Sequence, residues 1–238
     1  MTGWARLRQV VFASDHVERD GWLLAERLRL GPGFADPELA ALGMADDTRA
    51  LAAGSYLELV GALRGAAPDS GGAALARWVE KAGPGGYALS VQFPDPGAAV
   101  ARARSLGIRI VVDQDVRGRR IVQFHPADVG LLLELAGIAD PDAWFWDSLG
   151  ERAAPGALVD DVVAVEVPVE DPVTIANRWH ALLDLGEGGS DTTIWLGDRP
   201  VRFVPAAGGP RRWAVTLRRS GESNLADEVL LGVQLRYV

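Results

Sequence analysis

The chain has 238 residues, of which 48% are hydrophobic and 24% are charged, and these values are ordinary for a soluble globular protein. Its formal net charge of −8 argues against a nucleic-acid or anionic-membrane partner, since either needs a concentrated positive field. The absence of cysteine excludes disulfides, thiolate metal sites and thiol nucleophiles. No window approaches the roughly 18 apolar residues of a membrane span, and the opening residues do not resemble a signal peptide, so a cytoplasmic location is expected.

The first third of the chain predicts a strand, a helix and further strands. Leu7 to Ala13 is rich in β-branched residues, as strands are. Glu18 to Leu30 repeats apolar residues at a helical period, and Gly31-Pro32-Gly33 ends that helix. Two short strands are expected next, at Thr48 to Ala52 and Tyr56 to Val60, while one further strand of this unit is hard to place.

The same order of elements recurs more clearly in the second third. Tyr87 to Phe93 predicts a strand, and Asp95 followed by Pro96 predicts the N-cap and first turn of a helix that ends near Leu106. Three short strands are expected after it, at Arg109 to Val112, Arg119 to Phe124 and Gly130 to Leu135. Because the two copies share the order strand, helix, strands, the sequence indicates a fold built from repeated units.

A change of pattern marks a boundary beyond the second copy. Residues 139–158 contain prolines and interrupt the alternation of strands and helices, so we place a linker there. It separates a predicted domain at 1–138 from a second, shortened domain at 159–238.

The second domain predicts a partial version of the same unit, with a strand, a helix opened by Asp171-Pro172 and a hairpin at Ile194 to Val204. Another unit would begin near Trp213, but too few residues separate it from the final strands at Val229 to Val238 for a crossover helix. The fourth unit is therefore expected to be degenerate.

The closing strands of the first two units carry the same motif. Tyr56-Leu57-Glu58-Leu59-Val60 ends the first unit, and Leu132-Leu133-Glu134-Leu135-Ala136 ends the second. With Gln9 in the opening strand and the Phe124-His125-Pro126-Ala127-Asp128 run, this pattern resembles the vicinal oxygen chelate superfamily of glyoxalases, bleomycin-resistance proteins and methylmalonyl-CoA epimerases. The resemblance implies an α+β fold, in which repeated βαβββ units form cupped mixed β-sheets with helices on the outer face.

The resemblance also implies a metal centre. Ligands in that superfamily lie on the first and last strands of each unit, so Gln9, Glu58 and Glu134 correspond to metal ligands. One amide oxygen and two carboxylates suit a divalent cation with open positions for substrate. The implied cofactor is Ni, Zn, Co or Mn, and the alternative is a protein with no cofactor.

One position departs from the family pattern. The opening strand of the second unit should carry a ligand near Ala88 or Leu89, and neither side chain can bind a metal. Ser90 and Tyr87 are the nearest polar residues, and Ser90 would face the other side of the sheet if Leu89 faced the cavity.

The sequence around each glutamate supports a functional role for Glu134 more strongly than for Glu58. Glu134 has leucines on both sides, and an ionised carboxylate among apolar neighbours is costly unless a metal, a base or water compensates it. The simpler interpretation is a strand-end Glu that reaches solvent or an arginine. Glu58 lies closer to a turn, where the simpler interpretation is stronger.

Three further residues are candidates for ligand binding. His125 could donate to a substrate at the mouth of the cavity, or could be a turn histidine packed against the next proline. Trp144 and Trp146 could roof an apolar pocket or hold the two halves together. His16 and His180 are expected on the surface or in packing, so the sequence does not support the two-histidine, one-carboxylate triad of an iron dioxygenase. Five tryptophans are expected in the core: Trp22, Trp78, Trp179, Trp195 and Trp213.

These residues leave three functions open. The first is a metal-dependent lyase, isomerase or epimerase, in which the ion holds two adjacent substrate oxygens and Glu58 or Glu134 is the catalytic base. The second is a metal-free binding protein of the bleomycin-resistance type, and the third is a structural module. The expected partner is a small-molecule ligand, with no nucleic acid and no membrane, and a homodimer is left open.

Overall fold

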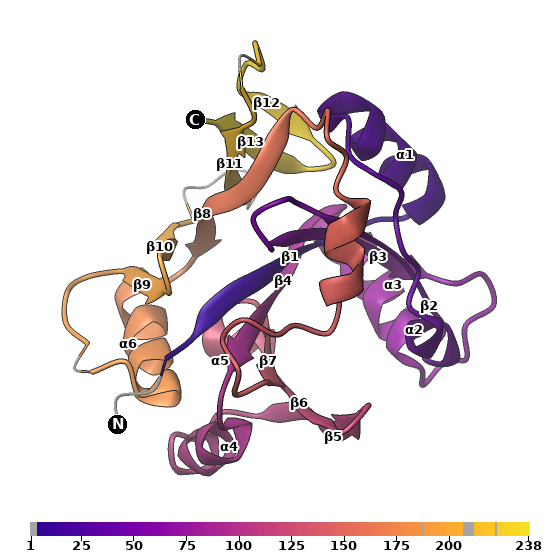
Figure 1. Cartoon of the computed structure of the whole chain (residues 1–238). Coiled ribbons are helices and arrows are strands. Elements are labelled where there is room, and N and C mark those ends of the chain that lie inside the picture. The colour runs from indigo at the N-terminus through magenta and orange to yellow at the C-terminus, as the bar shows by residue number, and fades with distance from the viewer. Residues whose placement is uncertain (1–3, 187, 207–211, 222) are drawn as a thin grey trace. The chain divides into compact units, whose positions relative to one another are not determined.

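A computed structural model describes residues 4–186, 188–206, 212–221 and 223–238 of the chain (Figure 1). Within these residues the strands form two mixed sheets, a seven-stranded sheet in the order β2-β3-β1-β4-β7-β6-β5 and a six-stranded sheet in the order β12-β13-β11-β8-β10-β9. The predicted α+β fold of repeated strand–helix–strand units is confirmed. No helix in the described ranges is long and apolar enough to cross a membrane.

The first repeat has one strand fewer than the pattern requires. Strand β3 pairs in parallel with β1 and antiparallel with β2. In place of the missing strand the chain forms the short helix α2, because Asp36 caps its first turn by accepting from the backbone N–H of Glu38, and Pro37 occupies the first position. Only an isolated bridge between Phe34 and Thr48 remains of strand pairing there. The elements are β1 (Arg6–Ala13), α1 (Val17–Leu28), α2 (Pro37–Ala41), β2 (Met44–Ala50) and β3 (Tyr56–Ala62), followed by α3 (Gly71–Ala82).

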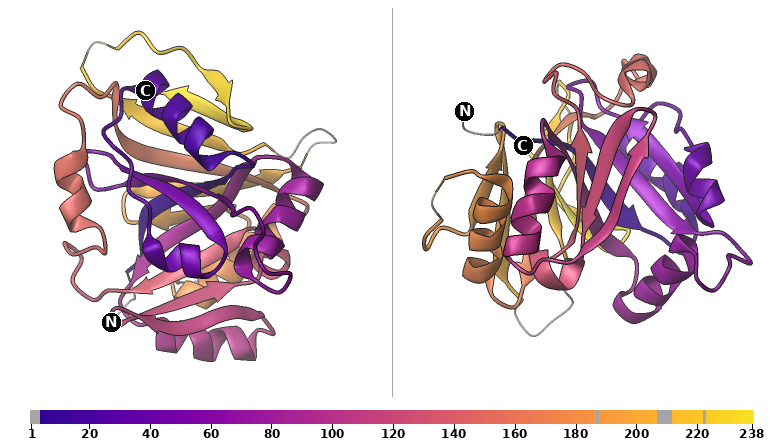
Figure 2. Two further views of the ribbon diagram at one scale, coloured as in Figure 1. Left: turned by 90° about the vertical axis from the view of Figure 1, so that its right-hand side faces the viewer. Right: turned by 90° about the horizontal axis from the view of Figure 1, so that it is seen from below.

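The second repeat is complete, as the sequence predicts. Its helix starts where Asp95 accepts a hydrogen bond of 3.1 Å from the backbone N–H of Ala98. Strand β7 pairs in parallel with β4 and antiparallel with β6, which also pairs with β5. Helix α4 packs against β6 and β7 (Figure 2). The elements are β4 (Gly85–Phe93), α4 (Pro96–Ser105), β5 (Ile110–Val116), β6 (Arg119–Phe124), α5 (Pro126–Val129) and β7 (Leu132–Gly137).

The last part of the chain contains a third unit, which is arranged like the first repeat, and a fourth unit without a helix. A short 3-10 helix, η1 (Asp147–Arg152), precedes it. Strand β10 pairs in parallel with β8 and antiparallel with β9, the arrangement that β3 has with β1 and β2. No helix occurs among the described residues of the fourth unit, which is degenerate as expected. The elements are β8 (Val159–Val169), α6 (Pro172–Leu183), β9 (Thr193–Leu196), β10 (Arg199–Pro205), β11 (Ala214–Arg219), β12 (Glu228–Leu230) and β13 (Val233–Tyr237).

The chain divides into two compact units. Each unit combines segments that are distant in sequence. The predicted domain boundaries at 138 and 158 stay a prediction. Unit 1 contains Met1–Arg8, Ala88–Phe145 and Val163–Ala214, and unit 2 contains Gln9–Tyr87, Trp146–Val162 and Val215–Val238.

Two of the five tryptophans expected in the core lie on the surface instead. Trp22 is 65% exposed and Trp195 is 58% exposed. Each residue of a helix is rotated by about 100° from the one before, so Trp22 points away from the face of α1 that buries Leu24. In β9, Ile194 and Leu196 are buried and Trp195 alternates to the opposite side. Trp179 and Trp213 are buried as predicted.

Candidate functional site

Glu134 lies at the centre of a polar group on three adjacent strands of unit 1. The register pairs it with Ser90 of β4 on one side and with Gln123 of β6 on the other, and residues paired directly across strands share a face. The Ser90 hydroxyl donates to Oε1 of Glu134 over 2.7 Å, and the Gln123 amide donates to Oε2 over 2.8 Å. Both carboxylate oxygens are therefore held by neutral donors.

The charge of Glu134 has no cationic partner among the residues that the structure describes. The side chain is half-buried, so it keeps partial access to solvent. Of the simpler interpretation, a strand-end Glu that reaches solvent or an arginine, the described residues contain partial access to solvent and no arginine partner. A carboxylate in this position retains lone pairs that can accept a hydrogen bond from a ligand.

Ser90 and Leu89 point to opposite faces of the sheet, as the alternation along β4 requires. Leu89 is fully buried on the opposite face, and it is Ala88, paired with Leu132, that shares the face of Ser90 and Glu134. The alternation Ser90, Gln92 in the strand was the signal that could have identified the polar face. The family position at Ala88 still offers no ligand atom.

The corresponding pair in unit 2 is Gln9 and Glu58. The Gln9 amide donates to Oε2 of Glu58 over 2.6 Å, and both side chains are buried, with exposed fractions of 5% and 9%. Thr48 of β2 pairs with Glu58 as Gln123 pairs with Glu134. Two of the three predicted ligands thus lie in contact. Because Glu134 belongs to unit 1, its convergence with them stays a prediction.

Asp46 is a buried carboxyl group on the same face of β2 and β3 that sequence analysis did not identify. It pairs with Val60, two residues from Glu58, and accepts from the backbone N–H of Asp36 over 2.9 Å. Burial is the main cause that raises the pKa of Asp46 to about 7, and the charges of Asp36 and Asp47 add to it. Polar residues in a strand do not reveal by themselves which of them will be buried.

The donor sets do not fit a divalent metal within either unit. Unit 2 brings together one amide and one carboxylate, Gln9 and Glu58. Unit 1 adds a hydroxyl and an amide to the carboxylate of Glu134, and both of those groups already donate to it. Across the described residues, no group of three or more His, Cys, Asp or Glu side chains could hold a metal. A divalent cation normally takes more anionic or imidazole ligands than this.

His125 caps the short helix α5. Its Nδ1 accepts from the backbone N–H of Ala127 over 3.1 Å, and the side chain is half-buried. Beside it, the hydrogen bonds and ion pair with Arg109 lower the pKa of Asp128 to about 2. The structure thus assigns His125 a local capping role, and its predicted contact with a substrate stays a prediction.

The three aromatic residues after the second repeat are packed against other residues. In unit 1, the Trp144 ring is 2% exposed and meets Phe145 edge to face, with ring centroids 5.6 Å apart. In unit 2, Trp146 lies 4.9 Å from the ring of Phe34, and its carbonyl accepts from the Tyr56 hydroxyl over 3.1 Å. The predicted ligand contacts of Trp144 and Trp146 stay predictions, and the burial of Trp144 requires it to move before a ligand could reach it.

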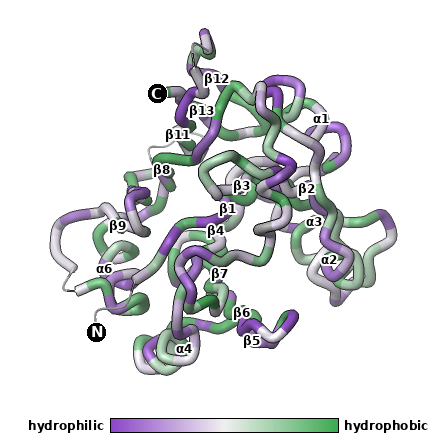
Figure 3. The backbone as a smooth tube through the Cα atoms, viewed as in Figure 1, coloured by the Kyte–Doolittle hydropathy of each residue, from purple (hydrophilic) through white to green (hydrophobic). Residues whose placement is uncertain are grey.

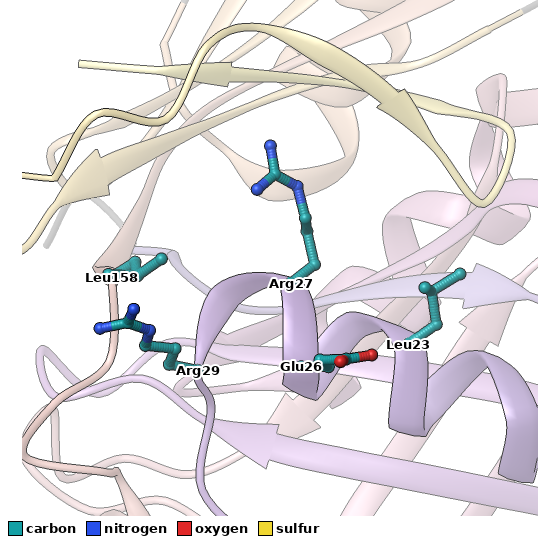
Figure 4. A pocket seen from close by; sticks show the side chains of 5 residues that line it. All are labelled: Leu23, Glu26, Arg27, Arg29 and Leu158. Atoms are coloured by element: carbon teal, nitrogen blue, oxygen red, sulfur yellow. The ribbon is translucent and has the colours of Figure 1, made fainter.

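A hollow of about 350 Å³ occurs elsewhere in unit 2, beside the end of α1 (Figure 4). Arg27 already donates from Nε to both carboxylate oxygens of Glu228, at 2.8 and 2.9 Å. The carboxyl end of a helix also carries partial negative charge, which disfavours an anionic ligand. We therefore place the candidate site at Glu134. The residues that line the hollow are Leu23, Glu26, Arg27, Arg29 and Leu158.

The fold and the repeated units identify the chain as having the vicinal oxygen chelate fold. A hypothetical protein from Staphylococcus aureus is similar over 98% of both chains, with a TM-score of 0.68 and 12% identity. Methylmalonyl-CoA epimerase from Mycobacterium tuberculosis matches 55% of this chain and 86% of its own, with a TM-score of 0.46 and 24% identity.

A variant of the Streptomyces coelicolor epimerase, in complex with 2-nitronate-propionyl-CoA, matches 55% of this chain and 95% of its own, with a TM-score of 0.45 and 23% identity. No family model matches the sequence. No curated protein matches it either. These similarities concern the fold, and function has to be argued from the residues of this chain.

Proposed function

We propose that this chain is a small-molecule-binding protein whose ligand presents an ammonium group, or another strong N–H donor, to Glu134. A single observation carries the proposal: a half-buried carboxylate is held by two neutral donors, Ser90 and Gln123, and has no cation beside it within the described residues. A partly desolvated anion of this kind gains free energy when a cation approaches it.

The two neutral donors would orient the carboxylate before a ligand arrives. Each occupies one lone pair of a different oxygen, so the remaining lone pairs point in restricted directions. A carboxylate held in this way loses little conformational freedom when it binds, which lowers the entropic cost of association. Because the donor sets do not fit a divalent metal, the proposal contains no metal-dependent step, and it agrees with the metal-free alternative of the sequence analysis.

Calorimetric titration with alkylamines and with the matching alcohols tests the proposal. The expected result is binding of the amines in preference to the alcohols, with affinity reduced at least about tenfold in Glu134→Gln, because a charge-assisted hydrogen bond is replaced by a neutral one. Glu166→Gln is the matched control, since Glu166 also lies in a strand of unit 1 and pairs with Arg202. Amine binding that is absent, or equal in both variants, would overturn the proposal.

A further inference from the structure

A second charge without a counter-ion lies on the same face of the sheet as Glu134. In β6 the residues Arg119, Ile121 and Gln123 alternate onto one face, and Gln123 and Ile121 pair with Glu134 and Ala136 of β7. Arg119 therefore shares the face of Glu134. Arg119 has no carboxylate partner among the described residues.

The guanidinium of Arg119 is held over an aromatic ring. Its Cζ lies 4.8 Å from the ring centroid of Phe145, a distance at which a cation is attracted to the π-system. The Nη1 atom is buried and has no hydrogen-bond partner in the described part of the chain. A buried N–H of a charged group without an acceptor is costly, and such a group in a folded protein calls for an explanation.

The neighbouring arginine has different surroundings. Arg120 points to the other face, where its guanidinium donates two hydrogen bonds to Asp113, at 2.8 and 2.9 Å. An added Cβ at Gly97 of α4 would lie 3.0 Å from the Arg120 guanidinium, so that face is the one covered by α4. The hairpin turn that joins β5 and β6 is strongly hydrophilic (Figure 3), yet Arg119 is half-buried against Phe145.

Arg119 and Glu134 are too far apart along the strands to neutralise each other. Arg119 precedes Gln123, the partner of Glu134, by four residues, which is about 13 Å of strand. Between them lie Ile121 and Ala136, which are apolar, with exposed fractions of 7% and 0%. The order along this face is an anion, a buried apolar stretch and a cation, so a ligand that reaches both charges has to displace the residues that cover Ile121 and Ala136.

From this arrangement we infer that the ligand is zwitterionic, with a carboxylate or similar anion at Arg119, its cationic end at Glu134, and an apolar body between them that replaces the present cover of Ile121. This inference rests on the proposed function and specifies its ligand class. A carboxylate of the ligand supplies the acceptor that Nη1 lacks, and the planar guanidinium is suited to bind it through two N–H groups. Phe145 holds the guanidinium over its ring. Because Nη1 is buried, a local shift of the residues around it has to open it to the ligand.

The test compares straight-chain amino carboxylic acids, which carry an amine and a carboxylate at opposite ends, with alkylamines of the same length. Calorimetry on the full chain should show tighter binding of the amino acids, with a length optimum set by the span of about 13 Å. In Arg119→Met the advantage should fall at least about tenfold, while alkylamine binding stays unchanged. Arg119→Lys should restore part of it, because it keeps the charge without the planar fork.

Arg120→Met is the matched control, since it removes an adjacent arginine that faces α4 and has a partner, Asp113. Thermal unfolding of all variants checks that the fold is retained. If alkylamines bind through Glu134 but the amino acids have no advantage, or keep it in Arg119→Met, the anion subsite is wrong and the proposed function stands. If amine binding does not depend on Glu134, the proposed function and this inference both fail.

Discussion

The two glutamates that close the first and second repeats occupy the same register position, but their surroundings differ. Glu58 faces Val11 of the opening strand, is 9% exposed, and accepts from the Gln9 amide over 2.6 Å. Glu134 faces Ser90, is half-buried, and accepts from a hydroxyl and an amide. Since one motif is found in two environments, the motif alone does not define the function of its glutamate. The surrounding donors and the degree of burial do.

The largest effect is expected in the response of the first region to pH, because this region contains Asp46, a buried carboxyl group with a raised pKa. The folded-state pKa of Asp46 is about 7, against 3.8 for an unperturbed group. Between pH 3.8 and about 7 the folded state holds a proton that the unfolded state has released. The free energy of unfolding therefore falls as pH rises through this range. Asp46→Asn should remove the decline and increase the free energy of unfolding above pH 7 by on the order of 3 kcal/mol.

Urea unfolding at several pH values measures the effect of Asp46→Asn. The control is Asp115→Asn in the β5–β6 hairpin, where the side chain is exposed, and its profile should follow that of the wild type. A pH profile for Asp46→Asn that is parallel to the wild type would contradict the assignment of the raised pKa to Asp46.

The next largest effect is a difference in stability loss when the amide donor of each glutamate is removed. Gln9→Leu should reduce the free energy of unfolding by about 2 kcal/mol, because it removes an amide donor from a buried carboxylate. Gln123→Leu should cost about 1 kcal/mol, since Glu134 keeps Ser90 and partial solvent access. Equal losses in urea titrations of the two variants would show that burial does not distinguish the sites.

A smaller change makes the second site resemble the first. Ser90→Val places at the partner position of Glu134 the residue that faces Glu58, namely Val11. The loss of one hydroxyl donor should reduce stability by about 1 kcal/mol. Amine affinity should fall severalfold, because the carboxylate is held by Gln123 alone. An unchanged amine affinity in calorimetry would show that Ser90 does not orient Glu134.

The smallest expected effect is with metals. Chelator-treated protein titrated with Ni, Co, Mn or Zn should show no binding tighter than millimolar, because no three His, Cys, Asp or Glu side chains of the described residues come together to hold a metal. Glu134→Gln should give the same result as the wild type. Micromolar binding at one site, lost in Glu134→Gln, would instead support the metal-dependent enzyme that the resemblance to glyoxalases implies.

Much of the fold was predictable because its signals are local. The aspartates before Pro96 and Pro172 cap their helices as predicted, since an N-cap needs only its own next few residues. The alternation of apolar residues located the strands of the second repeat for the same reason. The sequence did not locate one strand of the first repeat, because the chain forms a short helix capped by Asp36 in its place.

The sequence by itself determined the repeated strand–helix–strand units and the glutamate that closes each of the first two. Local hydrogen bonding, capping and hydrophobic period act over a few residues, so they can be read along the chain. Only the tertiary structure decided that Ser90 and Gln123 hold Glu134, that Asp46 is buried, and that Arg119 has no acceptor for Nη1. These properties depend on strand register and on packing between residues distant in sequence, which no local pattern specifies.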